Sequence, residues 1–139
     1  MKKPIGILTA RMGSSRVPGK AMMDLAGKPM IGRIVDRMRA VPVVDRIILA
    51  TSTDPRNEPM VAYAKSIGVD VYQHPDEEDM VARIFNAIED TDAETLLVTG
   101  GDCPLIEPEL LSEMLEIAMA DTSVDFVSPR LGWTYPVGL

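Results

Sequence analysis

The sequence predicts an α/β fold, a three-layer α/β/α sandwich with a mostly parallel sheet. Short runs rich in Ile and Leu alternate along the chain with amphipathic segments of about 10 to 15 residues, which is the pattern of successive βαβ units. The 139 residues have an ordinary composition, 46% hydrophobic and 25% charged, with no repeat or linker. We therefore expect residues 1–139 to form a single domain with a sizeable core.

Five short apolar runs are predicted to be strands, because continuous apolar runs of this length are typical of strands buried on both faces. They are residues 5–10, 46–51, 69–72, 95–99 and 124–127. Ligands of parallel sheets bind at the carboxyl ends of the strands, so a functional site is expected in the segments that follow these runs.

Four segments between the runs have apolar residues at helical spacing. The first follows Pro29, which suits a first helical position, and the second has Asn57 as a capping residue and Gly68 as a left-handed end. Asp79 is a plausible cap for the third, and the fourth begins at Pro108. The predicted buried faces are Ile31, Ile34, Val35 and Met38; Met60, Val61, Ala64 and Ile67; Val81, Ile84, Phe85 and Ile88; and Leu110, Leu111, Met114, Leu115 and Ala118.

Charge and cysteine content narrow the class of protein. The net charge of -7 argues against a general nucleic-acid binder, and the lone Cys103 cannot form an internal disulfide. No apolar run is long enough for a signal peptide or a membrane span, which predicts a cytoplasmic protein with no membrane partner. Residues 1–46 nevertheless carry ten Lys or Arg against three Asp, a net +7, while the remainder carries -14. This division indicates a small polyanionic ligand, such as a nucleotide, near the N-terminal third.

The connection after the first strand, residues 11–27, is much longer than usual for this position. It contains the sequence RMGSSRVPGK and combines cations, hydroxyls and glycines as phosphate oxygens require. The candidate phosphate-binding residues are Arg11, Gly13, Ser14, Ser15, Arg16, Gly19 and Lys20. A solvated basic loop is the alternative. The spacing fails the Walker A pattern, and the dinucleotide GxGxxG pattern is missing, which argues against an ordinary kinase or dehydrogenase.

A second candidate site residue, Asp102, follows the strand at 95–99. Gly100 and Gly101 allow the backbone to turn and approach a ligand, and a carboxylate at a strand's carboxyl end is a suitable Mg²⁺ ligand when it faces a triphosphate. The alternative is that Asp102 caps the next helix. Cys103 and His74 have no metal-ligand partners at suitable spacing and are interpreted as structural.

Several motifs together resemble the sugar-acid cytidylyltransferases, which act on acylneuraminate or 3-deoxy-octulosonate sugars. The resemblance is strongest in residues 10–20 with 25–30 and continues through residues 50–55, 79–83 and 101–106. It is closest to the branch of spore-coat polysaccharide biosynthesis. The resemblance implies a nucleotide-diphospho-sugar transferase fold and a reaction in which CMP passes from CTP to a sugar acid with release of pyrophosphate.

The resemblance also implies roles for individual residues. Arg11, Lys20 and Asp102 would be catalytic, and Asp102 would hold Mg²⁺. The nucleotide would be bound by Ala10, Arg11, Ser14, Ser15, Arg16 and Lys20, with backbone groups of residues 8–10 reading the pyrimidine. Homodimer formation stays open.

The last residues of the sequence bear on whether the protein is expected to be catalytic. In the resembling branch, a segment like residues 134–139 continues into Asp-Val-Glu, whose Asp is a second metal ligand, so the chain is expected to be short relative to the family. A catalytically weak or inactive nucleotide-binding module is therefore the second hypothesis. A guanylyltransferase is a further alternative, because it shares this fold and a phosphate-binding loop of this kind. A receiver-like signalling domain is disfavoured, because it would need a cluster of acidic residues after the first strand, where this chain has Arg11.

Overall fold

The computed structural model describes residues 2–129 of the chain. These residues form a four-stranded, entirely parallel sheet in the order β3-β2-β1-β4. The strands are β1 (Ile5–Thr9), β2 (Arg46–Ser52), β3 (Asp70–His74) and β4 (Leu96–Gly100). The α/β prediction is confirmed, and four of the five predicted strands lie within two residues of their expected bounds.

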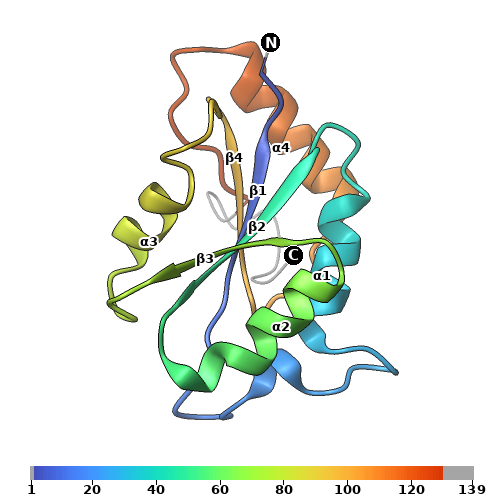
Figure 1. Ribbon diagram of the computed structural model, residues 1–139. Helices are drawn as coiled ribbons and strands as arrows, with labels where there is room; N and C mark the ends of the chain where they lie inside the picture. Colours follow the sequence, from blue (N-terminus) through green and yellow to red (C-terminus); the bar gives the residue numbers. More distant parts are fainter. Residues whose placement is uncertain (1, 130–139) are drawn as a thin grey trace.

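Helices cover both faces of this sheet (Figure 1). One face is covered by α1 (Met30–Arg39), α2 (Glu58–Ser66) and α4 (Pro108–Ala120), and the other by α3 (Met80–Ala87). Two short 3₁₀ helices, η1 (Lys20–Met22) and η2 (Pro55–Asn57), lie in the connections that follow β1 and β2.

The register of the central strand explains the two cores. Ile7 pairs with Ile48 and packs towards α3, whereas Leu8 pairs with Leu49 and packs towards the three-helix face. Ile7 and Leu8 are both fully buried, as expected for a strand with helices on both sides. Because all strands run the same way, their carboxyl ends at residues 9, 52, 74 and 100 share one edge of the sheet.

Two helix boundaries follow the predicted local chemistry. Gly68 adopts a φ of 72° just after α2, the left-handed conformation that favours glycine. The carboxylate of Asp79 accepts a hydrogen bond from the Ala82 N–H at 2.9 Å and so caps α3.

Two predictions about apolar segments are wrong. Within the described residues, 124–127 form no strand; they follow a turn in which the Val124 N–H donates to the Asp121 carbonyl, and Phe126 is 77% exposed. Val81 and Phe85 are also exposed, because α3 packs on the sheet through Ile84 and its neighbours and nothing in the described part covers its outer side. A run of apolar residues becomes a strand only where a neighbouring strand pairs with it.

None of the helices in residues 2–129 is long and apolar enough to cross a membrane.

Candidate active site

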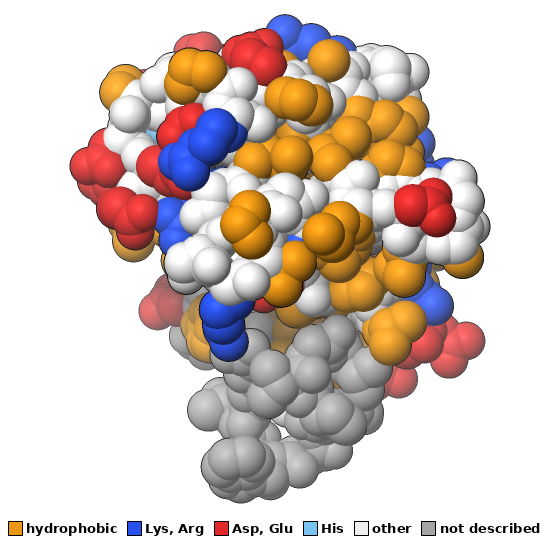
Figure 2. All heavy atoms as spheres, turned by 90° about the horizontal axis from the view of Figure 1, so that it is seen from below, with side chains coloured by type: hydrophobic (Ala, Val, Ile, Leu, Met, Phe, Trp, Pro, Cys, Tyr) orange, Lys and Arg blue, Asp and Glu red, His pale blue; other side chains and the backbone are white. Residues whose placement is uncertain are grey.

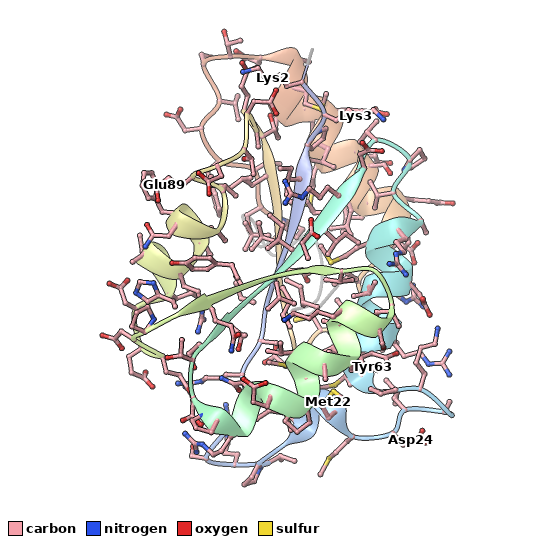
Figure 3. All side chains as sticks on the ribbon, in the orientation of Figure 1. Lys2, Lys3, Met22, Asp24, Tyr63 and Glu89 are labelled. Atoms are coloured by element: carbon pink, nitrogen blue, oxygen red, sulfur yellow. The ribbon has the colours of Figure 1, made fainter. Side chains whose placement is uncertain are left out.

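The site predicted from the sequence lies at the carboxyl edge of the sheet. Met22 and Asp24 mark the long connection after β1, at the lower end of the sheet and near α2 (Figure 3). Figure 2 views the protein from this side and shows cationic and acidic side chains close together, next to a broad area of apolar side chains. The convergence of loops here follows from the parallel topology.

The connection after β1 closes into a compact loop, residues 12–19, which we term the phosphate loop. The Gly19 N–H donates to the Met12 carbonyl at 2.9 Å, and Gly19 has a φ of 73°, which favours glycine at this turn. Ser15 and Arg16 are exposed between these two ends, and Ser14 is half-buried. The arrangement presents hydroxyls and a guanidinium to solvent on a closed backbone turn, and phosphate binding by this loop stays a prediction of the sequence.

Lys20 and Asp102 meet across the site. The Lys20 ammonium lies 3.7 Å from the Asp102 carboxylate, although 82 positions separate them in the sequence. Asp102 does not cap α4, because Glu107 occupies the N-cap position of that helix. The interpretation of Asp102 as a helix cap is therefore wrong, and its carboxylate, which is 59% exposed, faces the Lys20 ammonium directly after the phosphate loop.

Close backbone contact fixes the distance between the two loops. The Gly101 N–H donates to the Thr9 carbonyl at 2.7 Å, and a Cβ at position 101 would lie 2.5 Å from the Ala10 Cβ. Gly101 is thus required for the loop after β4 to pack against the start of the phosphate loop. Asp102 is held beside Lys20 by this packing.

Arg11 faces the opposite side of the site. Its guanidinium pairs with Glu78 and lies 3.6 Å from the Glu77 carboxylate, both in the connection between β3 and α3. Glu77 also lies 4.0 Å from Arg56. The structure therefore places Arg11 and Lys20 with different acidic partners, whereas the sequence grouped them in one phosphate-binding set.

Arg83 is a buried cation that residue patterns alone did not indicate. It is 5% exposed and donates from Nη1 to the Glu77 carbonyl at 3.2 Å, while its Nε has no hydrogen-bond partner in residues 2–129. Burial, together with the nearby positive charge of Arg11, lowers the pKa of Arg83 below the ordinary arginine value. The available signal was its place in segment 79–83, one of the motifs that carry the family resemblance, on a mostly apolar helix α3.

Arg16 differs from Arg11 and Lys20, the cations that flank the phosphate loop, because its guanidinium makes no ion pair with any side chain of residues 2–129. It is exposed on the phosphate loop and remains available for an anionic ligand. The described residues contain no group of three or more His, Cys, Asp or Glu that could hold a metal ion, so Asp102 offers its carboxylate without a protein cage.

Comparison with known proteins identifies the family. A family model described as cytidylyltransferase matches residues 5–130. The chain belongs to the cytidylyltransferase family. The 3-deoxy-manno-octulosonate cytidylyltransferase of Hahella chejuensis is 36% identical over 108 residues, 78% of this chain and 42% of that protein. The enzyme of the same name from Maricaulis maris is 35% identical over 129 residues, 91% of this chain and 49% of that protein.

A solved structure gives the same result in three dimensions. CMP:2-keto-3-deoxy-manno-octonic acid synthetase, complexed with CTP, superimposes with a TM-score of 0.77 and 31% identity over 88% of this chain and 50% of that one. The cytidylyltransferase fold is thus confirmed. The chain spans about half the length of these family members, and its resemblance to the spore-coat branch stays a prediction.

Proposed function

We propose that this protein acts as a nucleotidyltransferase that moves CMP from CTP to a sugar acid, with pyrophosphate as the second product. The observation that carries the proposal is the 3.7 Å approach of Lys20 to Asp102 beside the closed phosphate loop. This geometry puts a cation and a hard oxygen ligand side by side at the carboxyl edge of the sheet, next to the loop that would bind a triphosphate. Membership of the cytidylyltransferase family supports CTP as the nucleotide.

In the proposed reaction a hydroxyl oxygen of the sugar acid attacks the α-phosphorus of CTP. The new P–O bond forms as the bond from the α-phosphorus to the bridging oxygen of pyrophosphate breaks, and the hydroxyl proton passes to solvent. Transfer of this type depends on positioning and on cations where charge accumulates, and it needs no covalent enzyme intermediate. Arg16 and Lys20 would bind the triphosphate and stabilise the departing pyrophosphate, with Arg11 adding positive charge from the opposite side and Ser14 and Ser15 donating hydrogen bonds.

The donor set fits Mg²⁺ held with the nucleotide. Asp102 supplies one exposed carboxylate, and Mg²⁺ in such sites takes one or two carboxylates, with phosphate oxygens and water as its other ligands. When bound, the ion would neutralise phosphate charge and polarise the α-phosphate. Lys20 would then lie beside the same carboxylate and limit the negative charge that Asp102 presents to the nucleotide.

Two measurements on the same protein test nucleotide binding and turnover separately. Isothermal titration calorimetry with CTP and Mg²⁺ measures binding, and a pyrophosphate-release assay with 3-deoxy-manno-octulosonate and acylneuraminate as acceptors measures turnover. Binding and turnover with a sugar acid would support the proposal, whereas tighter binding of GTP than CTP would favour a guanylyltransferase instead. Failure to bind any nucleoside triphosphate would contradict the proposal.

A nucleotide-binding module without turnover is the second candidate function. One observation favours it: the described residues place a single predicted metal-binding carboxylate, that of Asp102, at the site. The segment expected to lead to a second metal ligand, residues 134–139, lies outside the described residues. Tight CTP binding with no pyrophosphate release from any sugar acid would support the module.

A further inference from the structure

The side chain of Asn57 connects the phosphate loop to the end of β2. Asn57 is fully buried, and its Oδ1 accepts a hydrogen bond from the Met12 backbone N–H at 2.8 Å. Its Nδ2 donates to the hydroxyl and the carbonyl of Ser52, at 2.8 and 3.3 Å. A buried amide with its donors and its acceptor all in use holds its neighbours in one arrangement, because an unmade bond there costs the full desolvation penalty.

These contacts differ from the role that the sequence predicts for Asn57. Asparagine at this position should cap α2 with its side chain, yet among the described residues no hydrogen bond of that kind is present. The acceptor that could have capped α2 instead bonds a backbone group 45 residues away in the chain. The side chain of Asn57 therefore stabilises the phosphate loop and not its own helix.

The connection continues from Ser52 to the charged side of the site. The Ser52 hydroxyl donates to the Glu77 carboxylate at 2.8 Å, and the other oxygen of that carboxylate lies 3.6 Å from the Arg11 guanidinium. These contacts therefore connect the backbone of Met12, through three side chains, to the side chain of the preceding residue, Arg11. We term Asn57, Ser52 and Glu77 the positioning relay.

Both ends of the phosphate loop depend on the hydrogen bond from the Met12 N–H to Asn57, which we term the anchor. The Met12 N–H is fixed by Asn57, and the Met12 carbonyl accepts the hydrogen bond from Gly19 that closes the loop. Gly13 lies directly against the relay, since a Cβ there would be 2.7 Å from Glu77 Oε1. Movement of Met12 would thus change both the loop closure and the clearance beside Gly13.

We propose that Asn57 is a positioning residue for triphosphate binding, acting through the positioning relay on the backbone of Met12 and on the side chain of Arg11. The inference rests on the proposed function, in which the phosphate loop binds CTP. Ordering a loop before its ligand arrives removes an entropic cost from binding, so loss of the relay weakens the triphosphate contacts in particular.

The first part of the test measures the loop without nucleotide. Asn57→Ala removes the anchor, and Ser52→Ala removes one hydroxyl and carries the test if Asn57→Ala does not fold. Thr51→Val is the matched control, since Thr51 is fully buried next to Ser52 and its hydroxyl has no hydrogen-bond partner within residues 2–129. Hydrogen exchange of the Met12 and Gly19 amides should accelerate about tenfold or more in the two relay variants and stay at the wild-type rate in the control. Wild-type exchange at both amides in Ser52→Ala would overturn the inference.

The second part measures CTP and CMP affinities by calorimetry in the presence of Mg²⁺, with folding checked by circular dichroism. The relay variants should bind CTP about tenfold more weakly, while CMP affinity and the Thr51→Val variant stay at wild-type values. Equal weakening of CTP and CMP would indicate a merely structural role and overturn the inference, as would unchanged CTP affinity. Wild-type protein that binds no CTP would contradict the proposed function itself, which distinguishes that failure from a failure of the relay alone.

Discussion

Replacing Lys20 with methionine is expected to remove most of the transferase activity and leave the fold intact. Methionine keeps a flexible apolar stem of similar length and removes the ammonium that lies 3.7 Å from Asp102. In the proposed function the Lys20 ammonium contacts a negatively charged phosphate oxygen of CTP. Two unit charges about 4 Å apart near a protein surface interact by about 4 kcal/mol, and partial exposure of Lys20 reduces its contribution to about 3 kcal/mol. A loss of about 3 kcal/mol of transition-state stabilisation lowers kcat/KM about 100-fold.

Stability should respond very differently from activity. The Lys20 and Asp102 side chains are 33% and 59% exposed, and exposed ion pairs contribute about 0 to 1 kcal/mol to folding. Lys28→Met is the matched control, because the Lys28 ammonium pairs with Asp36 of α1 at 2.5 Å with similar exposure, and Lys28 lies outside residues 11–20. Neither variant is expected to lower the melting temperature by more than about 4 °C.

The assay compares pyrophosphate release and CTP affinity in wild type, Lys20→Met and Lys28→Met under identical Mg²⁺ concentrations. If the wild type binds CTP without turnover, the same comparison is made on the dissociation constant for CTP, with an expected rise of about tenfold or more for Lys20→Met. Near-wild-type values for Lys20→Met would refute the assignment of Lys20 to triphosphate binding. An equal loss in Lys28→Met would show that general surface charge, and not position, is responsible.

Three further predictions follow from particular contacts. Asp102→Asn should abolish the dependence of CTP binding on Mg²⁺, measured by calorimetry with and without EDTA; Mg²⁺-dependent binding in this variant would exclude Asp102 as the metal ligand. Gly101→Ala should lower the free energy of unfolding by about 1 to 3 kcal/mol in urea titrations, because its Cβ would collide with Ala10, and wild-type stability would show that the two loops can separate. A hydrogen bond from Arg56 lowers the pKa of Asp54 to about 2, so the stability contributed by Asp54 is complete above its unfolded pKa of 3.8 and is lost as the pH falls towards 2. Asp54→Asn should therefore flatten the decrease in stability between pH 4 and pH 2 that acid titration of the wild type shows, and an unchanged slope would contradict this role.

The fold was largely predictable because its signals are local. Alternating apolar runs and amphipathic segments identify β1 to β4 and the four helices, and Gly68 and Asp79 mark helix ends through their own conformational preferences. Residues 124–127 were misassigned because a short apolar run does not show whether a partner strand exists. Val81 and Phe85 were assigned to the core for the same reason, since helical spacing identifies an apolar face but not the element that covers it.

The site was only partly predictable because its geometry depends on contacts distant in sequence. Lys20 and Asp102 could be inferred from the loop chemistry and the carboxyl ends of parallel strands, and the structure brings them together. Glu77 gave no comparable signal, because an acidic residue in a connection is a common feature of solvated surfaces. Arg83 belongs to the segment 79–83 that carries the family resemblance, but neither its burial nor its contact with Glu77 could be inferred from the sequence. Asn57 gave a misleading signal, since its local preference for capping is outweighed by the buried bond to Met12.

The two cations that flank the phosphate loop already have acidic partners, and this pairing changes what determines the affinity for a ligand. Arg11 is paired with Glu77 and Glu78, and Lys20 with Asp102, so a triphosphate binding here exchanges ion pairs and does not simply neutralise a bare basic surface. Exchange of one charge partner for another yields little net free energy unless the new geometry is better than the old. The advantage of the triphosphate must then come from several contacts made at once by a loop of fixed shape. That requirement gives the buried anchor between Met12 and Asn57 its importance, because it sets the shape of the loop before any nucleotide is bound.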